Sequence, residues 1–97
     1  MNTQDVVNSF LRKEKCRKVN NTVTDGESLV YHDNEIAWFD NNLLHISYCG
    51  WNTKTTRERL NMLPDVHVKC SKGIMYFKNP YTEFWEIWED GYKIIHI

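Results

Sequence analysis

Residues 28–48 read SLVYHDNEIAWFDNNLLHISY and contain three short apolar runs separated by Asp-Asn and Asp-Asn-Asn. Asparagine and aspartate tolerate the left-handed backbone conformations that tight hairpin turns require. The runs at 28–32, 35–39 and 43–48 therefore predict a three-strand antiparallel meander. Such a meander would contribute three strands to an antiparallel sheet.

An amphipathic helix is predicted before the meander, within residues 1–15. Its apolar side chains recur at helical spacing over 4–15: Val6, Val7, Phe10 and Leu11. Asn2 or Thr3 can cap the free amide groups of the first turn. The polar segment 16–26 is interpreted as a connector with room for a short strand around Val23.

A second helix is predicted after the break at Gly50-Trp51. Thr55 and Glu58 have capping-box spacing, in which each side chain satisfies a backbone amide at the other position. The helix should run over residues 55–63 and end before Pro64, because the residue before a proline disfavours helical geometry.

Two β-hairpins are predicted over residues 66–97. The first joins 66–70 to 74–78, and the second joins 84–88 to 92–97 around Asp90-Gly91. Every strand connection is short except the one through the second helix, so the strands should be mostly antiparallel. The sequence thus predicts a single α+β domain over residues 1–97. It should have a mostly antiparallel sheet of about six to seven strands, an N-terminal helix and one short central helix.

Composition supports a folded chain. The 97 residues are 41% hydrophobic and 26% charged, enough apolar side chains for one core. Cys16, Cys49 and Cys70 form no CxxC pair, so neither a disulfide framework nor a structural zinc site is expected. We see no signal-peptide pattern and no apolar window of membrane-spanning length. We therefore expect an intracellular protein that does not bind or cross a membrane.

The net charge of -1 conceals four blocks of alternating sign. Counting Lys and Arg against Asp and Glu, residues 1–18 carry +3 (five against two) and residues 54–78 carry +4 (six against two). Residues 19–53 carry -5 and residues 79–97 carry -3. The two basic blocks matter for binding only if the fold brings them onto one face.

Titratable side chains show no clear catalytic or metal-binding pattern. The four histidines are His32, His45, His67 and His96. Each lies on a different predicted strand without ligand spacing, so we expect no metal and no cofactor. The hypothesis of a nucleophilic cysteine, Cys49 or Cys70, activated by a histidine stays open, because such groups meet in space rather than in sequence. We interpret Glu83, Glu86 and Glu89 as solvated surface residues and do not expect an enzyme.

Hydroxyl and basic side chains gather in residues 49–61, CGWNTKTTRERLN. One hypothesis is a nucleic-acid surface, in which helix amides, threonine hydroxyls and basic groups contact phosphates. Its candidate residues are Thr53, Lys54, Thr56, Arg57, Arg59, Lys69 and Lys72. The alternative is a capped helix whose threonines serve its own first turn while Leu60 and Leu63 enter the core.

The chain ends with a dense set of aromatic residues. A strand over 84–88 carries apolar groups on both faces, which predicts either a two-sided core or one face for a partner. The candidate protein-binding residues are Trp51, Phe84, Trp85, Trp88 and Tyr92.

The central part of the chain resembles a family of small uncharacterised bacteriophage proteins. The residues that carry the resemblance are Tyr31-His32, Ile36, Leu44, Gly50-Trp51, Thr53, Thr55-Thr56, Arg59-Leu60-Asn61, Gly73 and Tyr76. It covers roughly residues 29–78, and Cys49 stands where a glycine is usual. The resemblance implies a phage origin and the host cytoplasm as the setting, and it carries over no mechanism.

These observations favour a small non-catalytic phage module that binds a host protein such as a defence or regulatory factor. Nucleic-acid binding through residues 54–78 is the first alternative, although the balanced charge favours it less. A minor structural protein of the virion is the second. We expect a monomer or a small homo-oligomer.

Overall fold

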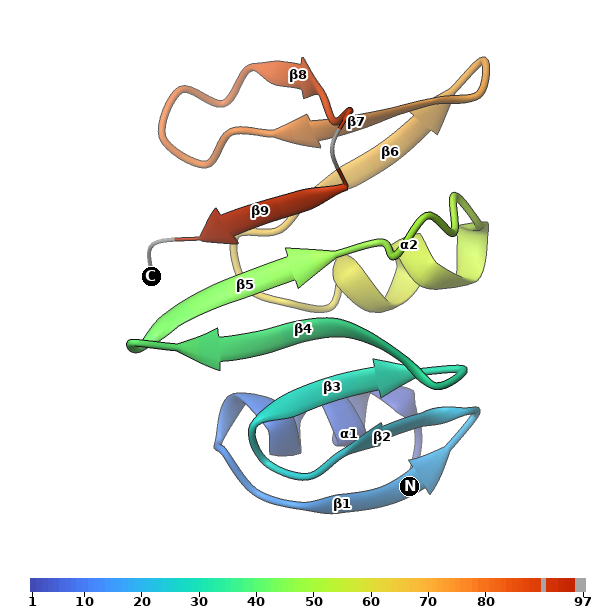
Figure 1. Cartoon of the computed structure of the whole chain (residues 1–97), viewed down its shortest axis with the longest axis vertical. Helices are drawn as coiled ribbons and strands as arrows, with labels where there is room; N and C mark the ends of the chain where they lie inside the picture. The colour runs from blue at the N-terminus through green and yellow to red at the C-terminus, as the bar shows by residue number, and fades with distance from the viewer. Residues whose placement is uncertain (90, 96–97) are drawn as a thin grey trace.

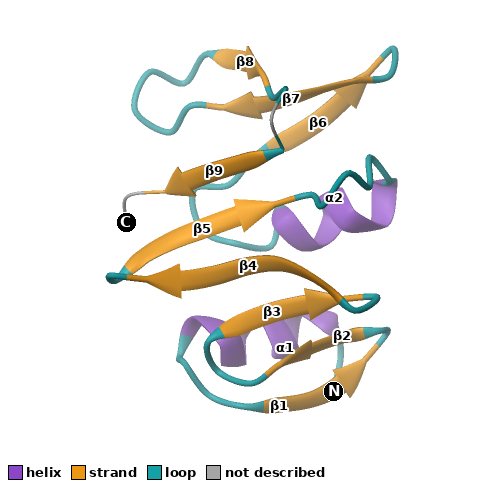
Figure 2. Ribbon diagram, viewed as in Figure 1, coloured by secondary structure: helices purple, strands orange, loops and turns teal. Residues whose placement is uncertain are grey.

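The computed structural model describes residues 1–89 and 91–95, which form two helices and nine strands in two antiparallel sheets (Figures 1 and 2). The elements are α1 (Thr3–Leu11), β1 (Cys16–Val19), β2 (Thr22–Thr24), β3 (Ser28–Tyr31), β4 (Asn34–Asp40), β5 (Leu43–Ser47), α2 (Lys54–Leu60), β6 (Val68–Ser71), β7 (Ile74–Lys78), β8 (Trp85–Ile87) and β9 (Tyr92–Ile95). The strand order is β1-β2-β3-β4-β5-β9 in one sheet and β6-β7-β8 in the other. The predicted α+β class is confirmed, with two sheets instead of one.

Helix α1 is capped at both ends by its own residues. The Asn2 side chain accepts the Asp5 amide at 3.0 Å, and the Asp5 carboxylate accepts the Asn2 amide at 2.8 Å. At the other end Lys13 turns left-handed with φ 61°, and the Glu14 amide donates back to the Ser9 carbonyl at 2.9 Å. This closed end stops the helix four residues before the predicted boundary.

The short strand predicted around Val23 is confirmed as β2, but the rest of the predicted connector is wrong, because residues 16–19 form β1 and pair with β2 in a hairpin. Asn20 and Asn21 occupy its turn with φ values of 51° and 62°. Two consecutive left-handed residues match the twist of a tight hairpin, and asparagine tolerates that conformation. The Asn20-Asn21 pair therefore indicates a hairpin turn, although the polar composition of the segment favours a loop.

The turn between β2 and β3 packs against the end of α1. Gly26, with φ 98°, lies so close to α1 that a Cβ there would sit 2.9 Å from the Lys13 carbonyl oxygen. The Asp25 carboxylate accepts the amides of Ser28 and Glu27, and these hydrogen bonds lower the pKa of Asp25 below its ordinary value. The turn is thus held in one shape against the helix.

Strands β3, β4 and β5 occupy the segment in which the sequence predicts the meander. The predicted hairpin of 84–88 with 92–97 does not form, because β8 pairs with β7 and β9 pairs with β5. On β9, Ile95 lies opposite Leu44 in the core, so the pairing buries apolar surface that a β8–β9 hairpin would leave exposed. Asp90 and residues 96–97 of that prediction lie outside the described residues.

The core lies on one face of the large sheet and extends beneath the small one. Helix α1 packs on β1, β2 and β3, and in Figure 1 it lies behind them. Phe10 of α1 stacks on Phe39 of β4 with ring centroids 4.9 Å apart. Trp88, just after β8, meets Tyr48 edge-on with centroids 4.7 Å apart. Trp88 therefore joins the small sheet to the same core.

Helix α2 begins at an N-cap different from the predicted one. The Thr53 hydroxyl accepts the Thr56 amide at 3.3 Å, whereas Thr55 lies inside the helix and is exposed. The capping prediction at Thr55 is thus wrong by two residues, since the chain already turns into the helix at Lys54. Neither helix in the described part of the chain is long and apolar enough to cross a membrane.

Replacing Thr53 with alanine should lower the free energy of unfolding by about 1 kcal/mol, because the cap is lost. Thr55→Ala is the matched control and should change it by less than about 0.5 kcal/mol. Urea denaturation followed by tryptophan fluorescence measures both. An equal loss in the two variants would contradict the cap assignment.

Candidate functional site

Two segments that are distant in the sequence meet at a pocket of about 360 Å³. We call it the Trp51 pocket, and its lining residues are Tyr31, His32, Asn34, Trp51, Thr53, Thr55 and Thr56. The first three come from the end of β3 and the start of β4, and the others from the junction that leads into α2. The fold therefore unites the Tyr31-His32 and Trp51-to-Thr56 parts of the sequence motif.

Trp51 is the exposed wall of this pocket. Its side chain is 56% exposed, and its backbone amide donates to the Tyr48 carbonyl at 2.8 Å. The hydroxyl groups of Thr53 and Thr56 are already engaged, because Thr53 donates to the Thr56 hydroxyl at 2.9 Å. The pocket thus offers mainly aromatic surface, while its threonines hold the first turn of α2.

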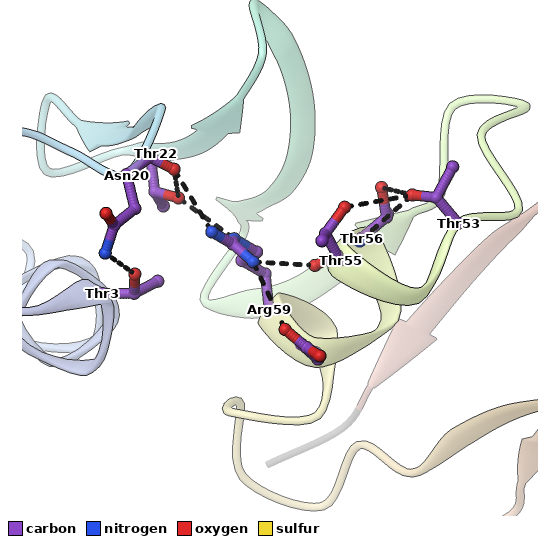
Figure 3. Close-up of polar contacts among 8 residues, drawn as sticks. Thr3, Asn20, Thr22, Thr53, Thr55, Thr56 and Arg59 are labelled. Carbon is purple, nitrogen blue, oxygen red and sulfur yellow. Dashed lines mark hydrogen bonds and ion pairs between the residues drawn. The ribbon is translucent and has the colours of Figure 1, made fainter.

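Arg59 of α2 lies beneath the pocket and is only 8% exposed (Figure 3). Its guanidinium donates to the Thr22 hydroxyl at 3.3 Å and to the Thr55 carbonyl at 3.2 Å. A third bond runs to the Asn20 carbonyl at 3.2 Å, and the guanidinium lies 4.3 Å from the Tyr31 ring centroid. Arg59 therefore joins α2 to the β1–β2 turn and to β3.

The residues of the nucleic-acid hypothesis divide into interior and surface groups. Thr56 and Arg59 are buried and make contacts within the protein, so they present nothing to a phosphate backbone. Thr53 is exposed, but its hydroxyl already accepts the Thr56 amide as the helix N-cap. Lys54, Lys69 and Lys72 are exposed, and Arg57 is half-buried.

Asn52 brings the helix and the β6–β7 turn together. Its side-chain oxygen accepts Arg57 at 2.8 Å, and its amide nitrogen donates to the Gly73 carbonyl at 3.4 Å. The basic residues of α2 and of this turn are therefore neighbours. The other basic block, over residues 1–18, lies with α1 and β1 at the opposite end of the molecule (Figure 1). The two basic blocks do not share one face.

The outer face of the small sheet forms a second candidate surface, which we call the aromatic face. Its residues are Lys69, Ile74, Tyr76, Lys78, Trp85 and Ile87. The register places Tyr76 opposite both Lys69 and Ile87, and Lys78 opposite Trp85. Lys69 extends over this face until its ammonium lies 4.3 Å from the Trp85 ring centroid. Phe84 is exposed just before β8.

The predicted protein-binding residues are therefore separated. Phe84 and Trp85 lie at the aromatic face, and Trp51 lies at its own pocket. Trp88 is 2% exposed and belongs to the core, so it offers no binding surface. Tyr92 lies on β9 of the large sheet, where its hydroxyl hydrogen-bonds the His45 ring.

Sequence reasoning missed Ile74, Tyr76, Lys78 and Ile87 of the aromatic face, and it named Lys69 only as a candidate for nucleic acid. The signal was present in residues 74–78, where Ile, Tyr and Lys alternate with Met and Phe. Alternation predicts two different faces but not which face is covered. That choice depends on the Met75 and Phe77 side chains, which are buried on the core side.

The histidines stay apart in the fold. His32 lines the Trp51 pocket, His45 is stacked on Trp38 with centroids 5.5 Å apart, and His67 is exposed. His96 lies outside the described residues. Within residues 1–89 and 91–95, no three His, Cys, Asp or Glu side chains gather where they could hold a metal ion.

Fold and surface together define a small antiparallel α+β protein with an aromatic pocket and an apolar, basic sheet face. The chain belongs to the Kyanoviridae Gp96 protein family, which it matches over residues 2–94. This is a family of cyanophage proteins, so the predicted resemblance to phage proteins is confirmed. Comparison with curated proteins and with solved structures found no match.

Arg59→Met should lower the free energy of unfolding by about 2–4 kcal/mol, because the buried Thr22 hydroxyl and two part-buried carbonyls lose their donor while an unbranched apolar stem is kept. Arg57→Met is the control and should cost less than about 1 kcal/mol, since Arg57 is half-buried with one side-chain hydrogen bond. Chemical denaturation compares the two variants. Equal stability of both would show that the buried contacts contribute little.

Proposed function

We propose that this cyanophage protein is a non-catalytic binding module that engages a protein of its host, with the aromatic face as the binding surface. The observation that supports this most directly is the grouping of exposed Ile74, Trp85 and Ile87 on one side of a three-strand sheet. Contiguous exposed apolar side chains of this kind are typical of protein-binding surfaces. The setting of this function is the host cytoplasm.

The charges around the aromatic face point to the chemistry of the partner. Lys69 and Lys78 lie on this face, and neither of them forms an ion pair with a described carboxylate. A surface with apolar side chains at its centre and lysines around them is complementary to a partner with acidic residues around an apolar patch. The proposed partner is therefore acidic at its contact surface.

Nucleic-acid binding is the second candidate, and one observation favours it. Asn52 places Arg57 beside the β6–β7 turn that carries Lys72, which gives a small basic cluster. Two observations weigh against it. Arg59 is buried, and the basic residues of α1 and β1 lie at the far end of the molecule. The described basic residues therefore form no continuous surface along which a nucleic-acid strand could bind.

Ile74→Asp should abolish capture of the partner from a lysate of the cyanobacterial host, because it places a carboxylate among the exposed apolar side chains of the aromatic face. Ile94→Asp is the matched control: Ile74 is 43% exposed and Ile94 is 41% exposed, but Ile94 lies on the large sheet. Capture with tagged protein and mass spectrometry measures both, with folding checked by circular dichroism. Equal capture by the two folded variants would remove the aromatic face from consideration.

The nucleic-acid candidate has a separate test. Replacing both Arg57 and Lys72 with glutamate should change the affinity for the captured host protein by less than about threefold relative to the unaltered chain. The reason is that these residues lie beside the aromatic face rather than in it. If nucleic acid is the partner, the same variant should lose salt-dependent binding of a fluorescent single-stranded oligonucleotide. Nuclease treatment that removes all captured protein would also favour nucleic acid.

A further inference from the structure

Strand β8 is the outer strand of the small sheet and has a free edge (Figure 1). The Asn79 amide donates to the Phe84 carbonyl at 2.9 Å, and the Trp88 amide donates to the Met75 carbonyl at 2.8 Å. In an antiparallel ladder the bonded positions alternate, so residues 84, 86 and 88 face β7. The backbone groups of Trp85 and Ile87 therefore point outward, and no strand of the described residues pairs with that edge.

The free edge of β8 differs from the free edge of the large sheet. Strand β1 carries Arg17 and Lys18 and has an irregular register with β2, both of which discourage another strand from pairing. On β8 the side chains of Trp85 and Ile87 are exposed and apolar, and the strand contains no lysine and no proline. Of these two edges, the one at β1 is thus blocked and the one at β8 is open.

We propose that an extended segment of the partner protein binds by adding a fourth strand to β8. Such strand addition takes affinity from main-chain hydrogen bonds and specificity from alternate side chains. The inference rests on the proposed function, because it specifies how the partner meets the aromatic face. An incoming strand lies about 4.8 Å from β8, so its side chains on one face extend the row of Trp85 and Ile87.

The side chains of the aromatic face define the sequence of the segment. The Lys69 ammonium crosses β7 to lie over Trp85, where it is within reach of an acidic residue opposite that ring. An apolar hollow of about 560 Å³ adjoins the other end of β8, with Ile74, Ile87 and Trp88 among its lining residues. The segment therefore carries an acidic side chain with aliphatic side chains two residues away on the same face.

A synthetic peptide of this pattern, acetyl-Val-Thr-Glu-Thr-Val-Thr-amide, provides the test. It is titrated to about millimolar concentration into the ¹⁵N-labelled full chain, and amide exchange is measured by NMR. The amides of Trp85 and Ile87 should exchange at least about tenfold more slowly, since strand pairing protects them from water. The same peptide with lysine in place of glutamate should bind at least about tenfold more weakly.

Proline substitution examines the same edge. Ile87→Pro removes an outward amide without removing a bond to β7, a position at which an edge strand tolerates proline. It should weaken binding of the glutamate peptide at least about tenfold, whereas Ile87→Val should leave it within about threefold. If Ile87→Pro does not fold, the amide exchange of Trp85 and Ile87 in the unaltered chain with peptide still tests strand addition, because that measurement needs no variant.

Several results would overturn strand addition. Absence of binding at millimolar peptide would do so, as would binding that leaves the exchange of Trp85 and Ile87 unchanged. Protection of these amides in the chain alone, with a dimer by sedimentation velocity, would identify a second copy as the occupant instead. If Ile74→Asp abolishes host-protein capture while the peptide leaves the edge amides unprotected, the proposed function stands and only the binding mode fails.

Discussion

The buried guanidinium of Arg59 is the contact that organises the surface of this protein. A charged group removed from water is costly unless hydrogen bonds surround it, and Arg59 has acceptors on α2 and on the β1–β2 turn. It also lies against the Tyr31 ring. Because Arg59 holds α2 beside β3, the junction that carries Trp51 lies beside Tyr31 and His32. Arg59 thus contacts lining residues from both segments of the Trp51 pocket, Tyr31 and Thr55.

The two sheets explain where exposed apolar surface remains. One core serves both, with α1 under the large sheet and Met75, Phe77 and Trp88 beneath the small one. A sheet of three strands has little area to cover, and Ile74, Trp85 and Ile87 on its outer face stay exposed. Exposed Trp85 and Ile87 follow from this arrangement. The same shortage of strands leaves the outer edge of β8 without a neighbouring strand among the described residues.

Local sequence signals correctly predicted the turns and the helix cap that depend only on residues within a short segment. Asp-Asn and Asp-Asn-Asn mark the turns of the meander, and Asn2 caps α1 through a reciprocal bond with Asp5. Where two local signals compete, the sequence reading failed. Thr53 and Thr55 are both plausible caps, and the choice depends on where the Gly50-Trp51 break lets the chain turn. The candidate site was predicted in part, since Trp51 and Trp85 are exposed while Trp88 is buried.

The sequence by itself determined the α+β class, the antiparallel strands, the phage family and the existence of a distinctive Trp51 junction, because these depend on turn residues, periodicity and a motif within short segments. Tertiary structure alone decided that β8 and β9 belong to different sheets, that Arg59 points inward and that the aromatic face stays open. Each of these depends on which distant segments share a core. Burial is a property of the packed chain, and two strands with similar apolar patterns acquire opposite exposure when only one of them is covered.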